Sequence, residues 1–155
     1  MGKLTKSIEI EASPEKVFAF INDAKKMNEA SKGFAEMEYT SKGPVGVGTT
    51  RHHIAKVGGQ EREMDMEITE FVKNKKMSDH TIGASKAKMG GSWTLEPTAK
   101  GTKLTNSFDY EVPYSVLGKV IDKLKLSKDM DKVMGKMLEN IKKALEAQLK
   151  SQMKG

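Results

Sequence analysis

Hydrophobic and polar positions alternate along most of the first two thirds of the chain, a pattern typical of half-buried strands. The first such run extends from Leu4 to Ala12 and leads directly into Ser13-Pro14-Glu15. Serine can cap a helix there, and proline suits the first helical position. The helix predicted from this start ends near Asp23. A second short helix is predicted over Lys25 to Lys32, where Gly33 ends it.

Six further runs are predicted as strands, because each alternates and is bounded by turn residues. They span Phe34–Ser41, Thr49–Lys56, Glu61–Phe71, Met77–Ile82, Lys88–Glu96 and Thr102–Val112. Gly58-Gly59-Gln60 and the segment from Pro97 to Gly101 predict two hairpins, and Gly90-Gly91 predicts a bulge or bend. Seven strands in total suffice for one curved antiparallel sheet.

The C-terminal segment changes to a helical period, which predicts one long amphipathic helix from about Tyr114 to Lys150. The apolar positions of this helix change phase near Leu126 to Asp129, so the stripes before and after this point are offset around the helix axis. Ser127 could cap a fresh start at that point, so we expect a kink or a short break.

Composition places the chain among single globular domains, here residues 1–155, with 37% hydrophobic and 31% charged residues. There is no cysteine, which excludes disulfides, zinc–thiolate sites and cysteine nucleophiles. The first residues lack the apolar stretch of a signal peptide, and no apolar run reaches membrane-spanning length. We therefore expect a cytoplasmic protein without stable membrane insertion.

The net charge of +6 is concentrated in the last helix, where residues 115–155 hold ten lysines and five acidic residues. This helix could make transient contact with an anionic surface, although a solvated outer face explains the charge as well. Arg51 and Arg62 are the only arginines, and no aromatic residue is interleaved with the lysines. Nucleic-acid binding is therefore not expected.

The three histidines, His52, His53 and His80, do not form a recognisable site. Neighbouring strand residues point to opposite faces, so His52 and His53 cannot line one site, and Asp79 faces away from His80. No metal-ligand spacing and no Ser/His/Asp set occurs. We expect no metal, no cofactor and no assigned catalytic residue, although an inward His53 or His80 could act as an acid or base.

The order of the elements, together with several short motifs, resembles the START/polyketide cyclase-like superfamily (SRPBCC). The motifs are the strand-to-helix entry Ile8–Phe18, the glycine turn Val45–Thr50, Ile68-Thr69-Glu70-Phe71, Trp93–Pro97 with Gly101–Thr105, and the closing helix Met137–Glu146. The resemblance covers nearly the whole chain.

The resemblance implies an α+β helix-grip fold. In this fold a curved seven-stranded antiparallel sheet wraps around a long C-terminal helix, and two short helices lie between strands 1 and 2. Members mostly bind apolar small molecules such as lipids, sterols, isoprenoids and polyketides, and some are cyclases. They share no catalytic residue, so the fold alone does not fix the chemistry.

Candidate ligand-binding residues follow from the strand faces and the helix stripe. They are Tyr39, Met64, Met66, His80, Trp93, Asn106, Phe108, Tyr110, Met130, Met134 and Met137. Flexible thioethers suit a surface that adapts to varied apolar ligands, but the same methionines could simply fill a core. Asn106 could orient a ligand carbonyl or hydroxyl, or it could bond to Tyr110, Tyr39 or a trapped water.

The sequence thus favours binding of a hydrophobic small molecule, for sequestration or transfer, in a cavity between the sheet and the last helix. Two alternatives stay open. One is a polyketide cyclase- or dehydratase-like enzyme that uses the same cavity, and the other is an interaction module that docks through its basic helix.

Overall fold

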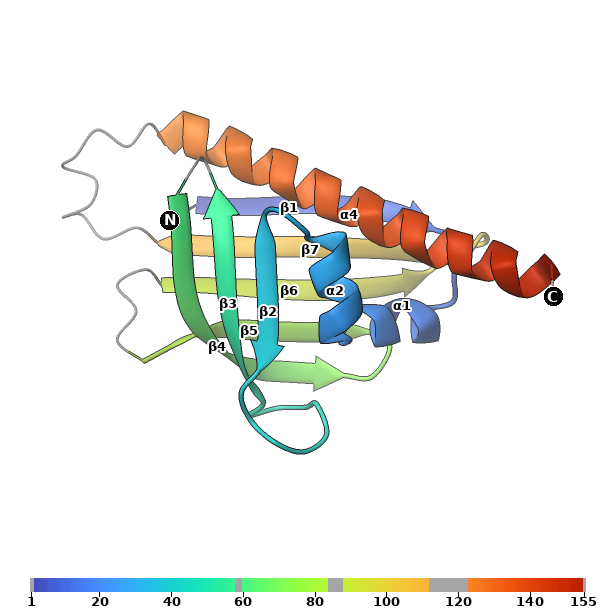
Figure 1. Ribbon diagram of the computed structural model, residues 1–155, viewed down its shortest axis with the longest axis horizontal. Coiled ribbons are helices and arrows are strands. Elements are labelled where there is room, and N and C mark those ends of the chain that lie inside the picture. Colours follow the sequence, from blue (N-terminus) through green and yellow to red (C-terminus); the bar gives the residue numbers. More distant parts are fainter. Residues whose placement is uncertain (1, 58–59, 84–87, 112–122, 155) are drawn as a thin grey trace.

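The computed structural model describes residues 2–57, 60–83, 88–111 and 123–154, and it contains one sheet and three helices (Figure 1). The strands are β1 (Gly2–Ile10), β2 (Ala35–Tyr39), β3 (Thr50–Val57), β4 (Gln60–Val72), β5 (Lys76–Ile82), β6 (Lys88–Pro97) and β7 (Thr102–Glu111). The helices are α1 (Pro14–Ile21), α2 (Ala24–Ala30) and α4 (Lys123–Lys154). The α+β helix-grip fold and all seven strands expected from the sequence are confirmed.

The seven strands form one antiparallel sheet in the order β1-β7-β6-β5-β4-β3-β2. Consecutive strands from β2 to β7 are neighbours, and β1 returns to pair with β7, so α1 and α2 connect the two edges of the sheet. Ser13 caps α1 by accepting from the N–H of Lys16 at 3.3 Å, and Asp23 caps α2 by accepting from the N–H of Lys26 at 3.1 Å. Gly33, beyond the end of α2, has a φ of 93°, which glycine adopts readily.

Helix α4 lies along β1 and crosses the sheet (Figure 1). Lys6 on β1 pairs with Asp131 at 3.0 Å near the start of the described helix. Farther along, Lys142 donates to the carbonyl oxygen of Glu9 at 2.8 Å, and Glu146 accepts from the N–H of Glu11 at 3.1 Å. These contacts join one flank of α4 to β1 and to Glu11 just after it. We call the sheet face toward α4 the inner face.

Of the kink or short break expected near Leu126 to Asp129, the break is wrong, because α4 is helical without interruption from Lys123 to Lys154. Figure 1 also draws α4 as one continuous helix without a sharp bend. Ser127 does not cap a new helix. Its hydroxyl instead hydrogen-bonds the Tyr110 hydroxyl of β7 at 2.9 Å. This contact explains why a polar residue, Ser127, interrupts the apolar stripe of α4. The start of the helix expected near Tyr114 lies outside the described residues.

Of the bulge or bend expected at Gly90-Gly91, the bulge is wrong, because β6 keeps a continuous register with both β5 and β7. A Cβ on Gly91 would lie 3.2 Å from the Asp79 carboxylate, so this glycine leaves room for a side chain. The register shift occurs on β4 between Ile68 and Glu70. After it, Phe71 packs against Phe18 of α1 with ring centroids 5.1 Å apart.

The contiguous apolar core gathers where α1, the strands and the C-terminal half of α4 meet. Its most deeply buried members are Ile10, Val17, Ile21, Ile68, Met77, Leu104, Leu138 and Ile141. Burying such side chains contributes about 1.5–3 kcal/mol each. None of the described helices is long and apolar enough to cross a membrane.

Candidate functional site

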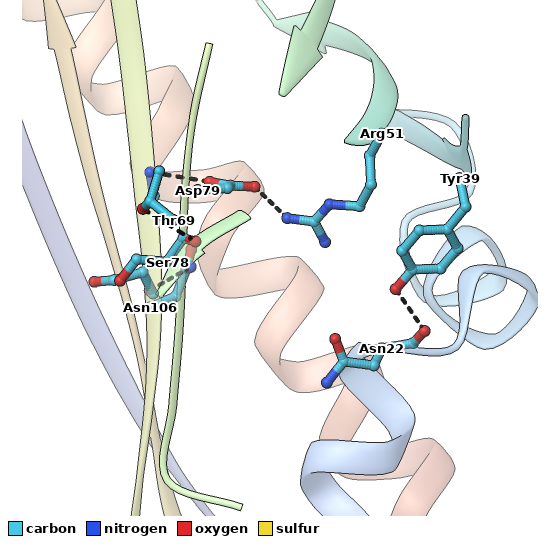
Figure 2. A network of polar contacts seen from close by, with 9 residues as sticks. Asn22, Tyr39, Arg51, Thr69, Ser78, Asp79 and Asn106 are labelled. Carbon is cyan, nitrogen blue, oxygen red and sulfur yellow. Dashed lines mark hydrogen bonds and ion pairs between the residues drawn. The ribbon is translucent and has the colours of Figure 1, made fainter. Parts of the chain in front are cut away.

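A buried ion pair crosses the interior on the inner face of the sheet. Arg51 of β3 donates from Nη2 to the carboxylate of Asp79 on β5, and these side chains are only 4% and 12% exposed. Figure 2 shows the two side chains reaching toward each other. Asp79 also accepts from the N–H of Gly91 at 3.2 Å. Burial raises the pKa of Asp79 above its usual range, and the neighbouring Arg51 charge opposes that rise.

Strand alternation explains why these charged residues point inward. Arg51 lies directly opposite Met66 on β4 and Tyr39 on β2, and paired residues of antiparallel strands share a face. Asp79 likewise follows Met77, a core residue, by two positions on β5. The fold therefore places two opposite charges on one face, where each offsets the burial cost of the other.

Tyr39 extends this polar cluster toward α1. Its hydroxyl donates to the backbone oxygen of Asn22 at 2.7 Å, as Figure 2 shows. Burial raises the pKa of Tyr39 above 10, and the charge of Arg51 partly opposes that rise. The side-chain oxygen Oδ1 of Asn22 is buried and has no hydrogen-bond partner among the described residues.

His53 lies two residues after Arg51 on the same face, opposite Met37 and Met64. Burial lowers the pKa of His53 to about 3, and the nearby charge of Arg51 adds to this effect. The ring is therefore neutral at neutral pH. Among the described residues, neither Nε2 of His53 nor Nε of Arg51 has a hydrogen-bond partner, although both atoms are buried.

Arg51 and His53 share the inner face with methionines, since Met66 lies opposite Arg51 and Met37 lies opposite His53. Met37, Met66, Met130 and Met134 are buried but lie outside the contiguous apolar core. We call these four residues the methionine end of the interior. The first two belong to the β2–β3–β4 side of the sheet that carries Arg51, and the other two belong to the N-terminal half of α4.

The structure brings most of the sequence-predicted site residues to the inner face. On the sheet these are Tyr39, Met64, Met66, Trp93, Asn106, Phe108 and Tyr110. On α4, Met130 and Met134 are buried, whereas Met137 packs, like Trp93, against the contiguous core. Asn106 donates from Nδ2 to the backbone oxygen of Ser92 at 3.2 Å, which is none of the partners expected for it.

The inward orientation implied for His80 is wrong. Met77 and Asp79 point to the inner face of β5, so His80, between Asp79 and Thr81, points to the outer face and is exposed. In the described parts of the chain, no three His, Cys, Asp or Glu side chains come together in a group that could hold a metal ion.

A family model described as polyketide cyclase/dehydrase and lipid transport matches residues 1–146. The chain belongs to this family. A search of curated proteins finds no match.

Solved structures show how widely this family's fold is shared. A START superfamily protein from Mycobacterium smegmatis has a TM-score of 0.75 at 13% identity, with 94% of this chain and 97% of that chain covered. TTHA0849 from Thermus thermophilus has a TM-score of 0.74 at 18% identity, covering 92% and 99%. The di-domain ARO/CYC StfQ of the steffimycin biosynthetic pathway has a TM-score of 0.74 at 13% identity, covering 95% and 52%. At these identities the likeness concerns the fold.

This member of the polyketide cyclase/dehydrase and lipid transport family buries Arg51 and Asp79, which the sequence did not predict to lie in the interior. The signal for Arg51 was present in the β3–β4 pairing predicted from the sequence, because its register sets Arg51 opposite Met66. For Asp79 the signal was its position two residues after Met77 on the same strand, because residues two apart point to the same face of a sheet. Charged residues in a strand are usually assigned to the solvent face, and no pattern along the chain indicates that these two are partners.

Proposed function

We propose that the protein binds a hydrophobic small molecule, such as a lipid, isoprenoid or polyketide, in a cavity at the methionine end of the interior. One observation carries the proposal: Arg51 Nε and His53 Nε2 are buried on one face without a hydrogen-bond partner among the described residues. Leaving such a group unpaired costs about 1–3 kcal/mol, so a ligand that satisfies both gains affinity. Family membership supports binding of this kind.

The polar end of the ligand would meet Arg51 and His53. Nε of Arg51 is always a donor, whereas Nε2 of a neutral histidine accepts or donates according to its tautomer. A hydroxyl or carbonyl oxygen can accept from Arg51, and a hydroxyl can at the same time donate to His53. Because Asp79 already neutralises Arg51, a ligand without charge suits this end better than a carboxylate.

The apolar body of the ligand would lie against the methionine end and the remaining inner-face residues. These are Met64, Trp93, Asn106, Phe108, Tyr110 and Met137. Methionine side chains adapt to different shapes, which suits sequestration or transfer of related molecules. His80 is not part of this proposal, because it lies on the outer face.

The pKa shifts of His53 and Tyr39 favour binding over catalysis. A general base works best with a pKa near the operating pH, and His53, with a pKa of about 3, is a weak base. Tyr39, whose pKa burial raises, is correspondingly a weak acid. We therefore rank a cyclase or dehydratase second, although family membership includes that activity.

Native mass spectrometry of the purified protein, with organic extraction of co-purifying molecules, tests the proposal. We expect a bound apolar molecule, or a thermal shift with neutral alcohols or ketones that carry long apolar tails. A mass without ligand, together with no thermal shift across such a panel, would contradict binding. The cytoplasmic location expected from the sequence stays a prediction that fractionation of the native cell would test.

Replacing Met66 or Met134 with tryptophan should abolish ligand uptake, because the indole would occupy the proposed cavity. The free energy of unfolding should change little, since an open cavity accommodates the extra volume. Uptake is measured by native mass spectrometry and unfolding by urea titration.

The control is Val72→Trp, at a position on β4 that is 46% exposed, which should leave uptake intact. If the interior were instead filled by side chains, Met66→Trp would lower the free energy of unfolding by about 1–3 kcal/mol through overpacking. That outcome, or unchanged uptake in both tryptophan variants, would remove this cavity assignment.

A further inference from the structure

One side of α4 carries a row of lysines. The exposed side chains are Lys128, Lys132, Lys136, Lys143 and Lys150. At about 100° per residue, these five fall within an arc of about 80° and extend along about 33 Å of helix. We call them the lysine stripe. The stripe lies on the side of α4 opposite the residues that face the sheet, which are Met130, Met134, Leu138, Ile141 and Leu145.

The charge of the lysine stripe is largely uncompensated. In the described part of the chain, the ion pairs of α4 are Lys6–Asp131 and Lys142–Glu146, and neither includes a stripe lysine. Two acidic residues fall within the same arc. They are Glu139 and Glu146. Glu146 is paired with Lys142 and also interacts electrostatically with Lys150, so it offsets the charge at one end of the stripe. The stripe therefore presents several unpaired positive charges to solvent.

The basic surface continues from α4 onto α2. A hollow of about 190 Å³ between these helices is lined by Lys26 of α2 and Lys143 of the stripe, with Phe20, Glu29, Ala30, Asn140 and Ala144. Lys25, which precedes Lys26 in α2, is also exposed.

On the β2–β4 part of the outer face of the sheet, away from α4, exposed acidic residues outnumber the exposed lysine, Lys56. The exposed ones on β2 and β4 are Glu36, Glu38, Glu61, Glu63 and Asp65. Opposite charge on the two sides gives the molecule a preferred orientation near any strongly charged surface. The lysine stripe would face a negative surface, and the acidic outer face would point away from it.

We propose that the lysine stripe docks the protein on an anionic lipid surface by charge alone. Among the α4 side chains that the structure describes, none is an exposed large hydrophobic residue, since the residues of that kind in the described chain are Val47 and Val72. A straight row of flexible ammonium groups needs only a dense, laterally uniform negative charge. Juxtamembrane lysines are attracted to anionic leaflets in this way.

The side-chain chemistry favours lipid over the other polyanions. Nucleic-acid readout relies on arginine and on aromatic stacking, and the stripe has neither. Tight protein interfaces are depleted in lysine at their centres. This inference stands on the charge of α4 and holds whether or not the interior binds a ligand.

Vesicle sedimentation tests the proposal with the whole protein. We expect binding to vesicles of equal parts phosphatidylcholine and phosphatidylglycerol, no binding to pure phosphatidylcholine, and loss of binding at high salt. The variant Lys132→Gln/Lys136→Gln/Lys143→Gln should bind on the order of a hundredfold more weakly, because each lysine near the surface is worth about fivefold.

The matched control removes three exposed lysines from other elements, as Lys56→Gln/Lys73→Gln/Lys100→Gln, for the same loss of net charge. This control should retain most of the binding. Equal loss in both triple variants would show that net charge rather than the stripe matters, and would overturn the proposal. So would failure to bind the anionic vesicles, or equally tight binding to single-stranded RNA at the same salt.

Discussion

Arg51→Met is expected to lower the free energy of unfolding by about 3–5 kcal/mol, since Asp79 then stays buried without its partner. Replacing both residues, as Arg51→Met/Asp79→Leu, should recover most of this loss, because the double variant buries no charge. Urea denaturation at neutral pH measures the two effects. The non-additivity of the single and double variants gives the coupling between the side chains.

A surface ion pair serves as the control for this cycle. Lys76 and Glu70 are joined at 2.7 Å, but both side chains are more than 40% exposed. Lys76→Met should therefore change the free energy of unfolding by less than about 1 kcal/mol. If Arg51→Met cost no more than Lys76→Met, Asp79 would be reached by water, and the pair could not be counted as buried.

The double variant also separates stability from function. A buried ion pair seldom stabilises a protein more than well-packed apolar residues of similar volume would. Recovery of stability without recovery of ligand uptake would mean that Arg51 serves to orient a ligand. Recovery of both would show that the polar end of the proposed cavity contributes little to affinity, and the apolar surface would then carry the binding.

The fold could be predicted from local patterns because each pattern has a local cause. Ser13 and Pro14 start α1 as their chemistry requires, and strand alternation together with the turn at Pro97 to Gly101 places β6 beside β7. The sequence-based predictions were wrong at residues that contact side chains distant in the sequence. Ser127 lies within α4, where its hydroxyl is hydrogen-bonded to Tyr110 of β7. Gly91 lies in register on β6, where its missing side chain leaves room for the Asp79 carboxylate.

The candidate site was only partly predictable for the same reason. Met66 and Tyr39 were placed on the inner face from alternation, which depends only on neighbouring residues. Arg51 between them shares that face by the same rule, yet a charge becomes tolerable there only through Asp79, 28 residues away. Side-chain pairs of this kind are set by the packing of the whole sheet rather than by a pattern along the chain.

Acidification should destabilise the protein through His53. Its pKa is about 3 in the folded protein and near 6.5 when unfolded, so between these values only the unfolded chain takes up the proton. The free energy of unfolding then falls by up to about 1.4 kcal/mol per pH unit, or about 2 kcal/mol from pH 6.5 to about pH 5. Urea denaturation at several pH values measures this slope.

The comparison that isolates His53 is between the wild type and His53→Leu, which should lack this part of the slope. His52→Gln should keep it, because the hydrogen bond of His52 to Asp65 raises the pKa of His52 instead of lowering it. The stabilising effect of His52 is therefore complete below pH 6.5. Asp79 acts in the opposite direction, since its raised pKa favours proton uptake by the folded state. The difference between variants is therefore more informative than the slope of the wild type alone.

The difference in slope between wild type and His53→Leu also shows whether water reaches His53 in the interior. A dry interior keeps His53 neutral and gives the full slope, whereas a water-filled cavity would solvate the imidazolium and move its pKa toward 6.5. An identical slope in wild type and His53→Leu would thus contradict the shielding of the His53 ring from water. If water does solvate His53 in the free protein, a ligand that occupies the proposed cavity should displace that water and restore the full slope.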